Sequence, residues 1–153
     1  MTAVTVEQDV AAPADRVWEL ISDVTRMGEW SPENTGAKWK GDLTGPVVGA
    51  RFSGSNSNGK KRWSTDCTIT ESEPGKEFGF RVRAAGLKIA HWSYRIESTA
   101  TGCHVTETWT DKRGGFAKFA GKFASGVDDR AAHNREGMVQ TLAALAAAAE
   151  RSA

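Results

Sequence analysis

The chain has 153 residues, with 20 Lys and Arg against 19 Asp and Glu, so its formal net charge is +1 at pH 7. This balance gives no bulk electrostatic reason to expect nucleic acid as a partner, and the N-terminal residues lack the apolar core of a signal peptide. No apolar run reaches the length of a membrane span, and the two cysteines, Cys67 and Cys103, are too few for a disulfide framework. We therefore expect one cytoplasmic domain over residues 1–153, with free thiols and no integral membrane contact.

The first 32 residues predict a strand followed by two short helices. Valines alternate with polar residues over 3–11, which is typical of a half-buried strand. Pro13 fits the first turn of a helix, and apolar residues recur with helical spacing over 17–24. A second short helical turn over 25–30 should end before Pro32, because the residue that precedes a proline disfavours the helical conformation.

Residues 34–112 predict the rest of a sheet. Apolar and polar residues alternate in short runs that are separated by glycine-containing and proline-containing turns. The connections are short, so we expect a mostly antiparallel meander of about seven strands when the first strand is included. One side of each strand is aromatic or aliphatic and the other is charged or hydroxylated, which predicts a sheet with one wet face.

Two patterns in this region resemble functional motifs but lack the context that those motifs need. Residues 54–61 come within one residue of the phosphate-binding pattern G-x-x-x-x-G-K-S/T, but Lys61 stands where the hydroxyl is required and a strand follows instead of a helix. We interpret this segment as a hairpin turn. His91, His104 and His133 lack the spacing of metal ligands, so we expect no metal and no other cofactor.

The last third of the chain predicts a single long helix from about Gly121 to Ala149, on the order of 40 Å in length at 1.5 Å per residue. Charged residues, Arg130 among them, lie off its apolar stripe. The helix should pack this stripe against the apolar face of a curved sheet, which leaves a gap where the two surfaces do not meet. The stripe consists of Phe119, Phe123, Val127, Ala131, Asn134, Met138, Leu142, Leu145 and Ala149.

Six tryptophans are the main compositional clue. By period-two parity, one face of the sheet carries Trp39, Phe52, Trp63, Phe80, Trp92, Tyr94 and Trp109. Ordinary core packing accounts for such a set as well as a binding site does. In the final strand, Val105, Glu107 and Trp109 are assigned to this face, opposite His104, Thr106, Thr108 and Asp111. An unpaired carboxylate in a dry core costs several kcal/mol, so Glu107 should meet a cation or hydroxyl or should line a wet pocket.

Several short motifs follow one another along the chain in a characteristic order. They are Pro13-x-x-x-Val17-Trp18, Ser22-Asp23, Trp30-Ser31-Pro32-Glu33, Gly45-Pro46-Val47-Val48-Gly49-Ala50-Arg51-Phe52, Trp92-x-Tyr94-x-Ile96 and Val105-Thr106-Glu107-Thr108. Their order before a final long helix resembles the START-like (Bet v 1-like, SRPBCC) superfamily, and more narrowly its polyketide cyclase/dehydrase-like branch. The resemblance covers essentially the whole chain and implies an α+β helix-grip fold, in which an antiparallel sheet grips a C-terminal helix around a cavity for apolar ligands.

Three classes of function stay open on these grounds. The first is binding or transport of a small hydrophobic ligand, aromatic, polyketide-like or lipid-like. The second is a cyclase or dehydratase in which Glu107 acts as acid and base with help from Tyr94. The third is a protein-interaction module, and the oligomeric state is open. The expected ligand contacts are Trp30, Trp39, Phe52, Trp63, Thr65, Cys67, Phe80, Trp92, Tyr94, Glu107, Trp109, Asn134 and Met138.

A flexible segment near the start of the long helix is expected to gate the cavity. Gly114, Gly115 and Gly121 permit hinge motion, and the segment is tipped with Phe116, Phe119 and Phe123.

Overall fold

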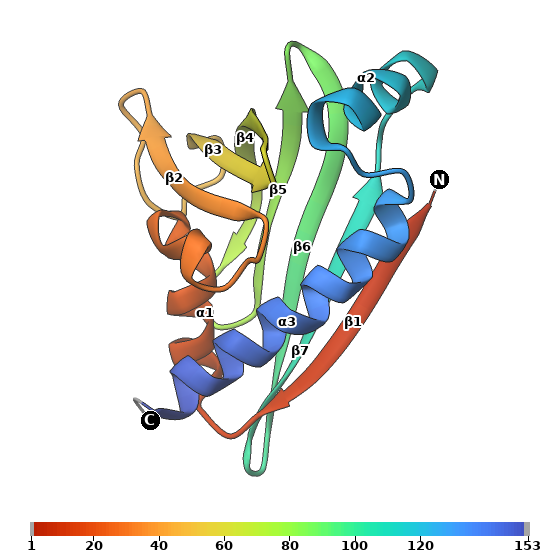
Figure 1. The fold of residues 1–153 in the computed structure, drawn as a ribbon. Helices are drawn as coiled ribbons and strands as arrows, with labels where there is room; N and C mark the ends of the chain where they lie inside the picture. The colour runs from red at the N-terminus through yellow and green to blue at the C-terminus, as the bar shows by residue number, and fades with distance from the viewer. Residues whose placement is uncertain (1, 152–153) are drawn as a thin grey trace.

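The computed structural model describes residues 2–151 and places seven strands in one antiparallel sheet (Figure 1). The order across the sheet is β1-β7-β6-β5-β4-β3-β2, so β2 to β7 form a meander and β1 pairs with β7. The predicted helix-grip class and the predicted number of strands are confirmed. The strands are β1 (Ala3–Val10), β2 (Asn34–Lys40), β3 (Arg51–Asn58), β4 (Lys61–Glu73), β5 (Glu77–Ala84), β6 (Leu87–Thr99) and β7 (Gly102–Asp111).

The sheet curves around its apolar face. Irregularities in strand pairing occur between Asn34 and Gly36, between Ile69 and Glu71, and between Val82 and Arg83. Such bulges bend a strand and increase its twist. The long strands β4 and β6 can therefore follow the curve, and Figure 1 shows α3 (Arg130–Arg151) crossing the concave side diagonally.

The segment 54–61 forms the β3–β4 hairpin, as predicted, with Gly59 and Lys60 in the turn. The two short helices after β1 are also confirmed, as α1 (Ala14–Ser22) and the 3-10 helix η1 (Val24–Glu29). Helix α1 buries Val17, Leu20 and Ile21 against the core. No helix within residues 2–151 is long and apolar enough to cross a membrane.

The prediction of one helix from Gly121 to Ala149 is wrong. The structure has α2 (Gly115–Ser125), a four-residue break, and then α3. Gly126 ends α2 in the left-handed conformation (φ 70°), and its N–H donates to the Lys122 carbonyl at 2.9 Å. Asp129 begins α3 by accepting a hydrogen bond from the Ala132 N–H at 3.0 Å. These two local end signals override the apolar period that continues across them.

The break also changes the predicted apolar stripe. Phe119 and Phe123 belong to α2 and are 63% and 67% exposed, so they do not pack on the sheet. From Met138 onward the stripe is in the core, where Met138, Leu142 and Leu145 are each at most 2% exposed. The sheet therefore packs around a C-terminal helix as predicted, but this helix begins at Arg130.

The assignment of Asp111 to the wet face is also wrong. Burial in β7 alternates from Cys103 onward, and Asp111 shares the inner face with Glu107 and Trp109. It is 7% exposed, and its Oδ2 atom forms an ion pair with Arg113 at 2.9 Å. The pKa of Asp111 is lowered because the hydrogen bonds and charge of Arg113 outweigh the effect of burial.

Candidate functional site

A cavity of about 350 Å³ lies between the concave face of the sheet and the helices α2 and α3. Its wall is mostly apolar, and Phe52, Phe80 and Met138 are among its buried members. The exposed members of the lining, including Pro32 and Ala85, mark its rim at the η1–β2 loop and the β5–β6 turn. The volume falls in the range that is typical of small-molecule sites.

The structure brings together twelve of the thirteen residues that were predicted as ligand contacts. Trp39 is the exception, because it packs edge-on against Phe52 with 5.9 Å between ring centroids and does not line the cavity. The role of the other twelve as ligand contacts stays a prediction. They are Trp30, Phe52, Trp63, Thr65, Cys67, Phe80, Trp92, Tyr94, Glu107, Trp109, Asn134 and Met138.

The predicted gate has a different structure from the one expected. Residues 115–125 form a helix instead of a glycine loop, and the gate residues Gly115, Phe116, Phe119 and Phe123 lie outside the cavity lining. The small residues of α2 line the cavity in their place, namely Ala117, Ala120, Gly121, Ala124 and Ser125. Helix α2 is therefore one wall of the cavity, and its role as a gate stays a prediction.

Glu107 is the most perturbed carboxyl group of the site. It is 2% exposed and lies opposite Tyr94 in the β6–β7 register. Burial raises its pKa to about 8, and a hydrogen bond from the Tyr94 hydroxyl lowers the pKa only in part. Burial also raises the pKa of Tyr94 well above its usual value, and the nearby Glu107 charge raises it further. Near neutral pH, Glu107 is therefore mostly a neutral acid beside a neutral phenol.

Two residues that line the cavity each carry a buried polar atom without a hydrogen-bond partner among the described residues. These atoms are Oε1 of Glu107 and the indole Nε1 of Trp30. Buried polar groups in native proteins are nearly always paired, so each unpaired one calls for a specific explanation. An indole N–H only donates, while a carboxyl oxygen accepts and, when protonated, donates. Two residues of the lining thus carry an unpaired buried polar atom, one a donor and the other a donor or an acceptor.

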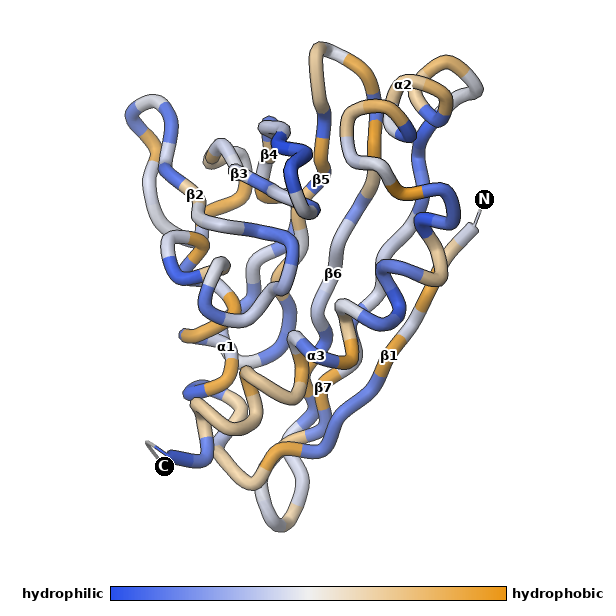
Figure 2. Tube along the Cα trace, in the orientation of Figure 1, coloured by the Kyte–Doolittle hydropathy of each residue, from blue (hydrophilic) through white to orange (hydrophobic). Residues whose placement is uncertain are grey.

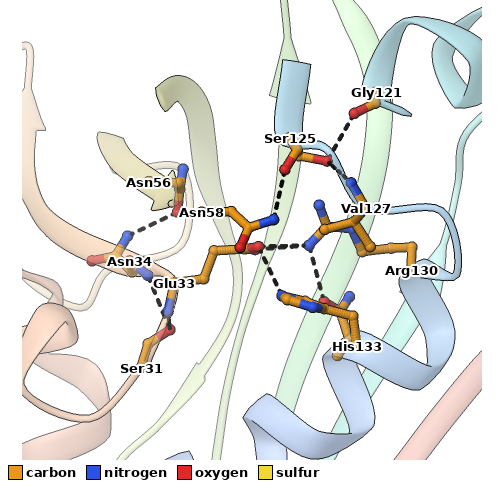
Figure 3. A network of polar contacts seen from close by, with 11 residues as sticks. Ser31, Glu33, Asn34, Asn56, Asn58, Gly121, Ser125, Val127, Arg130 and His133 are labelled. Atoms are coloured by element: carbon orange, nitrogen blue, oxygen red, sulfur yellow. Dashed lines mark hydrogen bonds and ion pairs between the residues drawn. The ribbon is translucent and has the colours of Figure 1, made fainter. Parts of the chain in front are cut away.

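A polar network closes one side of the site between the η1–β2 loop and α3 (Figure 3). Arg130 Nη1 donates to both carboxylate oxygens of Glu33, at 2.8 and 2.9 Å, and to Asn134 Oδ1 at 3.3 Å. His133 Nε2 lies 3.2 Å from Glu33 Oε2, and the Arg130 guanidinium lies over the Trp63 ring at 5.8 Å. This network joins the loop to the first turn of α3 at the cavity wall.

A second polar link ties the β3–β4 hairpin to the end of α2. The Asn58 side chain donates to the Ser125 carbonyl at 2.8 Å, and the Ser125 hydroxyl donates to the Gly121 carbonyl at 2.8 Å (Figure 3). The sequence did not predict that Asn58 and Ser125 would link the hairpin to α2, and the spacing of charges placed Arg130 on the outer side of the helix. One signal was available for Arg130, because Arg130 and Asn134 are four residues apart and Asn134 was assigned to the cavity side.

Cys67 is another ionisable group on the cavity wall. Burial raises the pKa of the Cys67 thiol to about 12, so this group is not a nucleophile near neutral pH. Within residues 2–151, no group of three His, Cys, Asp or Glu side chains could hold a metal ion.

The comparisons with known proteins agree with this geometry. Residues 1–150 match the model of the family described as polyketide cyclase / dehydrase and lipid transport. The solution structure of the Polyketide_cyc-like protein Cgl2372 from Corynebacterium glutamicum is 33% identical with a TM-score of 0.61, over 94% of this chain and 88% of that one. A comparison with curated proteins gave no match.

Two more distant structures share the fold alone. The di-domain ARO/CYC protein StfQ from the steffimycin biosynthetic pathway is 15% identical with a TM-score of 0.76, over 98% of this chain and 51% of that one. Major latex-like protein 151 from Panax ginseng is 12% identical with a TM-score of 0.73, over 97% of both chains.

Proposed function

The chain belongs to the polyketide cyclase/dehydrase and lipid-transport family, and on that premise we propose that it binds a small hydrophobic ligand that carries at least one polar oxygen. The observation that supports this proposal is the pair of unpartnered buried atoms, Glu107 Oε1 and Trp30 Nε1, in two residues that line a mostly apolar cavity. An entirely apolar ligand would leave both atoms unpaired, at a cost of about 1–3 kcal/mol each. A phenol or a ketone can pair with one or both of them.

The required polarity also narrows the ligand class. The lining includes the side chains of Trp63, Trp92 and Trp109, against which a flat aromatic ring can pack. Neutral Glu107 can accept from a ligand hydroxyl or donate to a ligand carbonyl, and Trp30 can donate to either oxygen. A phenolic or polyketide-like aromatic compound satisfies these conditions better than a saturated hydrocarbon chain does.

The test compares naphthol with naphthalene, which differ by one hydroxyl, by titration and tryptophan fluorescence. We expect naphthol to bind more tightly. Trp30→Phe keeps the apolar ring and removes the N–H, so it should reduce the preference for naphthol by up to about tenfold if the hydroxyl is paired there. Glu107→Leu removes both carboxyl oxygens and tests the other position, and Trp39→Phe is the matched control, since Trp39 does not line the cavity.

The proposal fails if neither compound binds, or if both compounds bind equally tightly to the wild type. It also fails if the Trp30 and Glu107 variants both keep the preference of the Trp39 control. In that case the two unpaired atoms do not contact the ligand.

Acid–base catalysis is a second candidate because the pKa of Glu107, at about 8, lies close to neutral pH. Such a group can both donate and accept a proton during enolisation of a ketone or loss of water from a β-hydroxyketone, with Tyr94 as a neighbouring hydrogen-bond donor. Catalysis predicts that Glu107→Gln abolishes turnover of a β-hydroxyketone while naphthol still competes for the cavity. Equal turnover by the variant and the wild type would remove this candidate.

A further inference from the structure

Helix α2 exposes an apolar stripe to solvent. Phe116, Phe119 and Phe123 are 72%, 63% and 67% exposed and are spaced by three and four residues, which places them on one face. The rings of Phe119 and Phe123 contact each other edge-on, with 5.4 Å between centroids. Three large aromatic side chains on one exposed helical face form a patch that marks an interaction surface. Figure 2 shows the hydrophobic colouring of α2 at the end of the molecule away from both α1 and the C-terminus.

The other side of the same helix borders the cavity. Its lining residues are all small, and Ala117 and Ser125 are buried. A single helix, whose cavity-facing side chains are short, therefore separates the cavity from the exposed phenylalanines. Whatever covers the phenylalanine stripe lies one helix diameter from the cavity.

Cations flank the stripe. Lys118 and Lys122 are exposed on α2, and Lys112 precedes it. The basic triplet 60–62 joins this surface because the Asn58–Ser125 hydrogen bond holds the β3–β4 hairpin against the end of α2. Asp128 and Asp129 are the acidic residues in the adjacent break, and Asp129 caps α3. Six cations therefore gather at one end of a chain whose net charge is only +1.

We propose that α2 docks this protein on an anionic lipid surface. Phe116, Phe119 and Phe123 enter the interfacial region, and Lys118 and Lys122 contact the headgroups. An apolar stripe beside lysines is the pattern of an interfacial helix, and anionic lipids attract each such lysine by about 1 kcal/mol, or about fivefold in partitioning. With α2 docked, the helix that forms one wall of the cavity would lie against the bilayer, in which hydrophobic ligands dissolve. The docking is independent of the proposed function. Only the idea that a ligand passes between bilayer and cavity rests on the proposed function.

The charge pattern favours a membrane over a protein as the occupant. A protein that bound α2 in a groove would need apolar and acidic sites placed to match its phenylalanines and lysines. An anionic membrane interface accommodates the phenylalanines and the lysines at the same time. A second copy of this chain would bring the same six cations together, which like-charge repulsion opposes. These other occupants are distinguishable outcomes of the test.

The experiment is sedimentation of the full chain with vesicles of phosphatidylcholine alone or with roughly one third phosphatidylserine. We expect binding to the anionic vesicles that weakens with added salt. Phe119→Ser with Phe123→Ser should lower partitioning at least about tenfold, since each ring loses the transfer of its apolar surface. Lys118→Glu with Lys122→Glu should do the same. Val139→Ser, at a 52% exposed position on α3, is the matched control and should change nothing.

Serine is the chosen replacement because its helix propensity is close to that of phenylalanine, so α2 should persist. Circular dichroism and unfolding midpoints that match the wild type verify this. The proposal is overturned if the wild type does not bind anionic vesicles, if the phenylalanine variant binds as well as Val139→Ser, or if gel filtration shows a dimer that the phenylalanine variant dissociates. Naphthol binding without vesicle binding overturns docking alone, and vesicle binding without naphthol binding overturns the proposed function alone.

Discussion

Replacing Glu107 by glutamine should stabilise the protein, and the gain should depend on pH. The ordinary pKa of this carboxyl is 4.5, and burial raises it to about 8 in the folded chain. Below the ordinary value the group is neutral in both states, so its burial costs little. As the pH rises from 4.5 towards 8, the unfolded chain ionises and the folded chain does not, which lowers the stability of the fold by about 1.4 kcal/mol per pH unit. Near pH 7 the accumulated loss is about 3 kcal/mol.

Glutamine is neutral at every pH and keeps an acceptor for the Tyr94 hydroxyl, so it avoids this loss. We expect Glu107→Gln to unfold at clearly higher urea concentration than the wild type near pH 7, and at nearly the same concentration near pH 4. The gain near pH 7 should correspond to roughly 6–12 °C in melting temperature for a chain of this size. Glu136→Gln, on the exposed side of α3, is the control and should lack a gain of this size.

The reasoning is refuted if the stability difference between Glu107→Gln and the wild type is the same at both pH values. A constant difference would mean that Glu107 ionises alike in the folded and unfolded states. In that case its burial would not control its charge, and its place as a neutral acid in the proposed site would be lost.

Three further outcomes test the local structure around the site. Asp129→Ala should cost about 1 kcal/mol in urea unfolding by removing the cap of α3, whereas Asp128→Ala should cost much less, and equal losses would contradict the assigned cap. Gly126→Ala should destabilise by about 1–2 kcal/mol because its φ of 70° is strained for an L side chain, and a neutral result would argue against the break. Cys67, with a pKa of about 12, should resist a thiol reagent near pH 8 until urea unfolds the chain, and rapid native labelling would contradict its burial.

The sheet was predictable because period-two alternation persists through long, regular strands. Parity alone placed Trp63, Trp92 and Glu107 on one face, and the structure finds them on one cavity wall. The assignment of Asp111 to the wet face broke the alternation of β7. Asp111 is two residues beyond Trp109 and four beyond Glu107, so alternation places it on their face. Counting alternation to the end of β7 would have found this buried acid, although not its partner Arg113, which lies beyond the strand.

The helical part was less predictable because two kinds of signal conflict there. Apolar spacing runs on from Phe119 to Ala149, while Gly126 and Asp129 mark a helix end and a helix start. Spacing describes only which residues could share a face, whereas the caps are hydrogen bonds that the backbone forms locally. The polar network was beyond sequence reasoning for another reason. Glu33 and Arg130 are 97 residues apart in the chain, and the tertiary fold brings Arg130 Nη1 within 2.8 Å of Glu33 Oε1.

The break at Gly126 connects the fold to both proposals. A helix that continued from α3 without a break would carry Phe119 and Phe123 on the stripe that faces the sheet, and these rings would compete with a ligand for the space beneath it. Because the chain turns at Gly126, α2 presents alanines to the cavity and phenylalanines to the outside. The same turn leaves the cavity open enough to hold a ligand and creates the exposed stripe that we assign to a lipid surface. A substitution that straightened the chain at Gly126 should therefore impair ligand binding and vesicle binding together, whereas substitutions in the stripe should affect vesicle binding first.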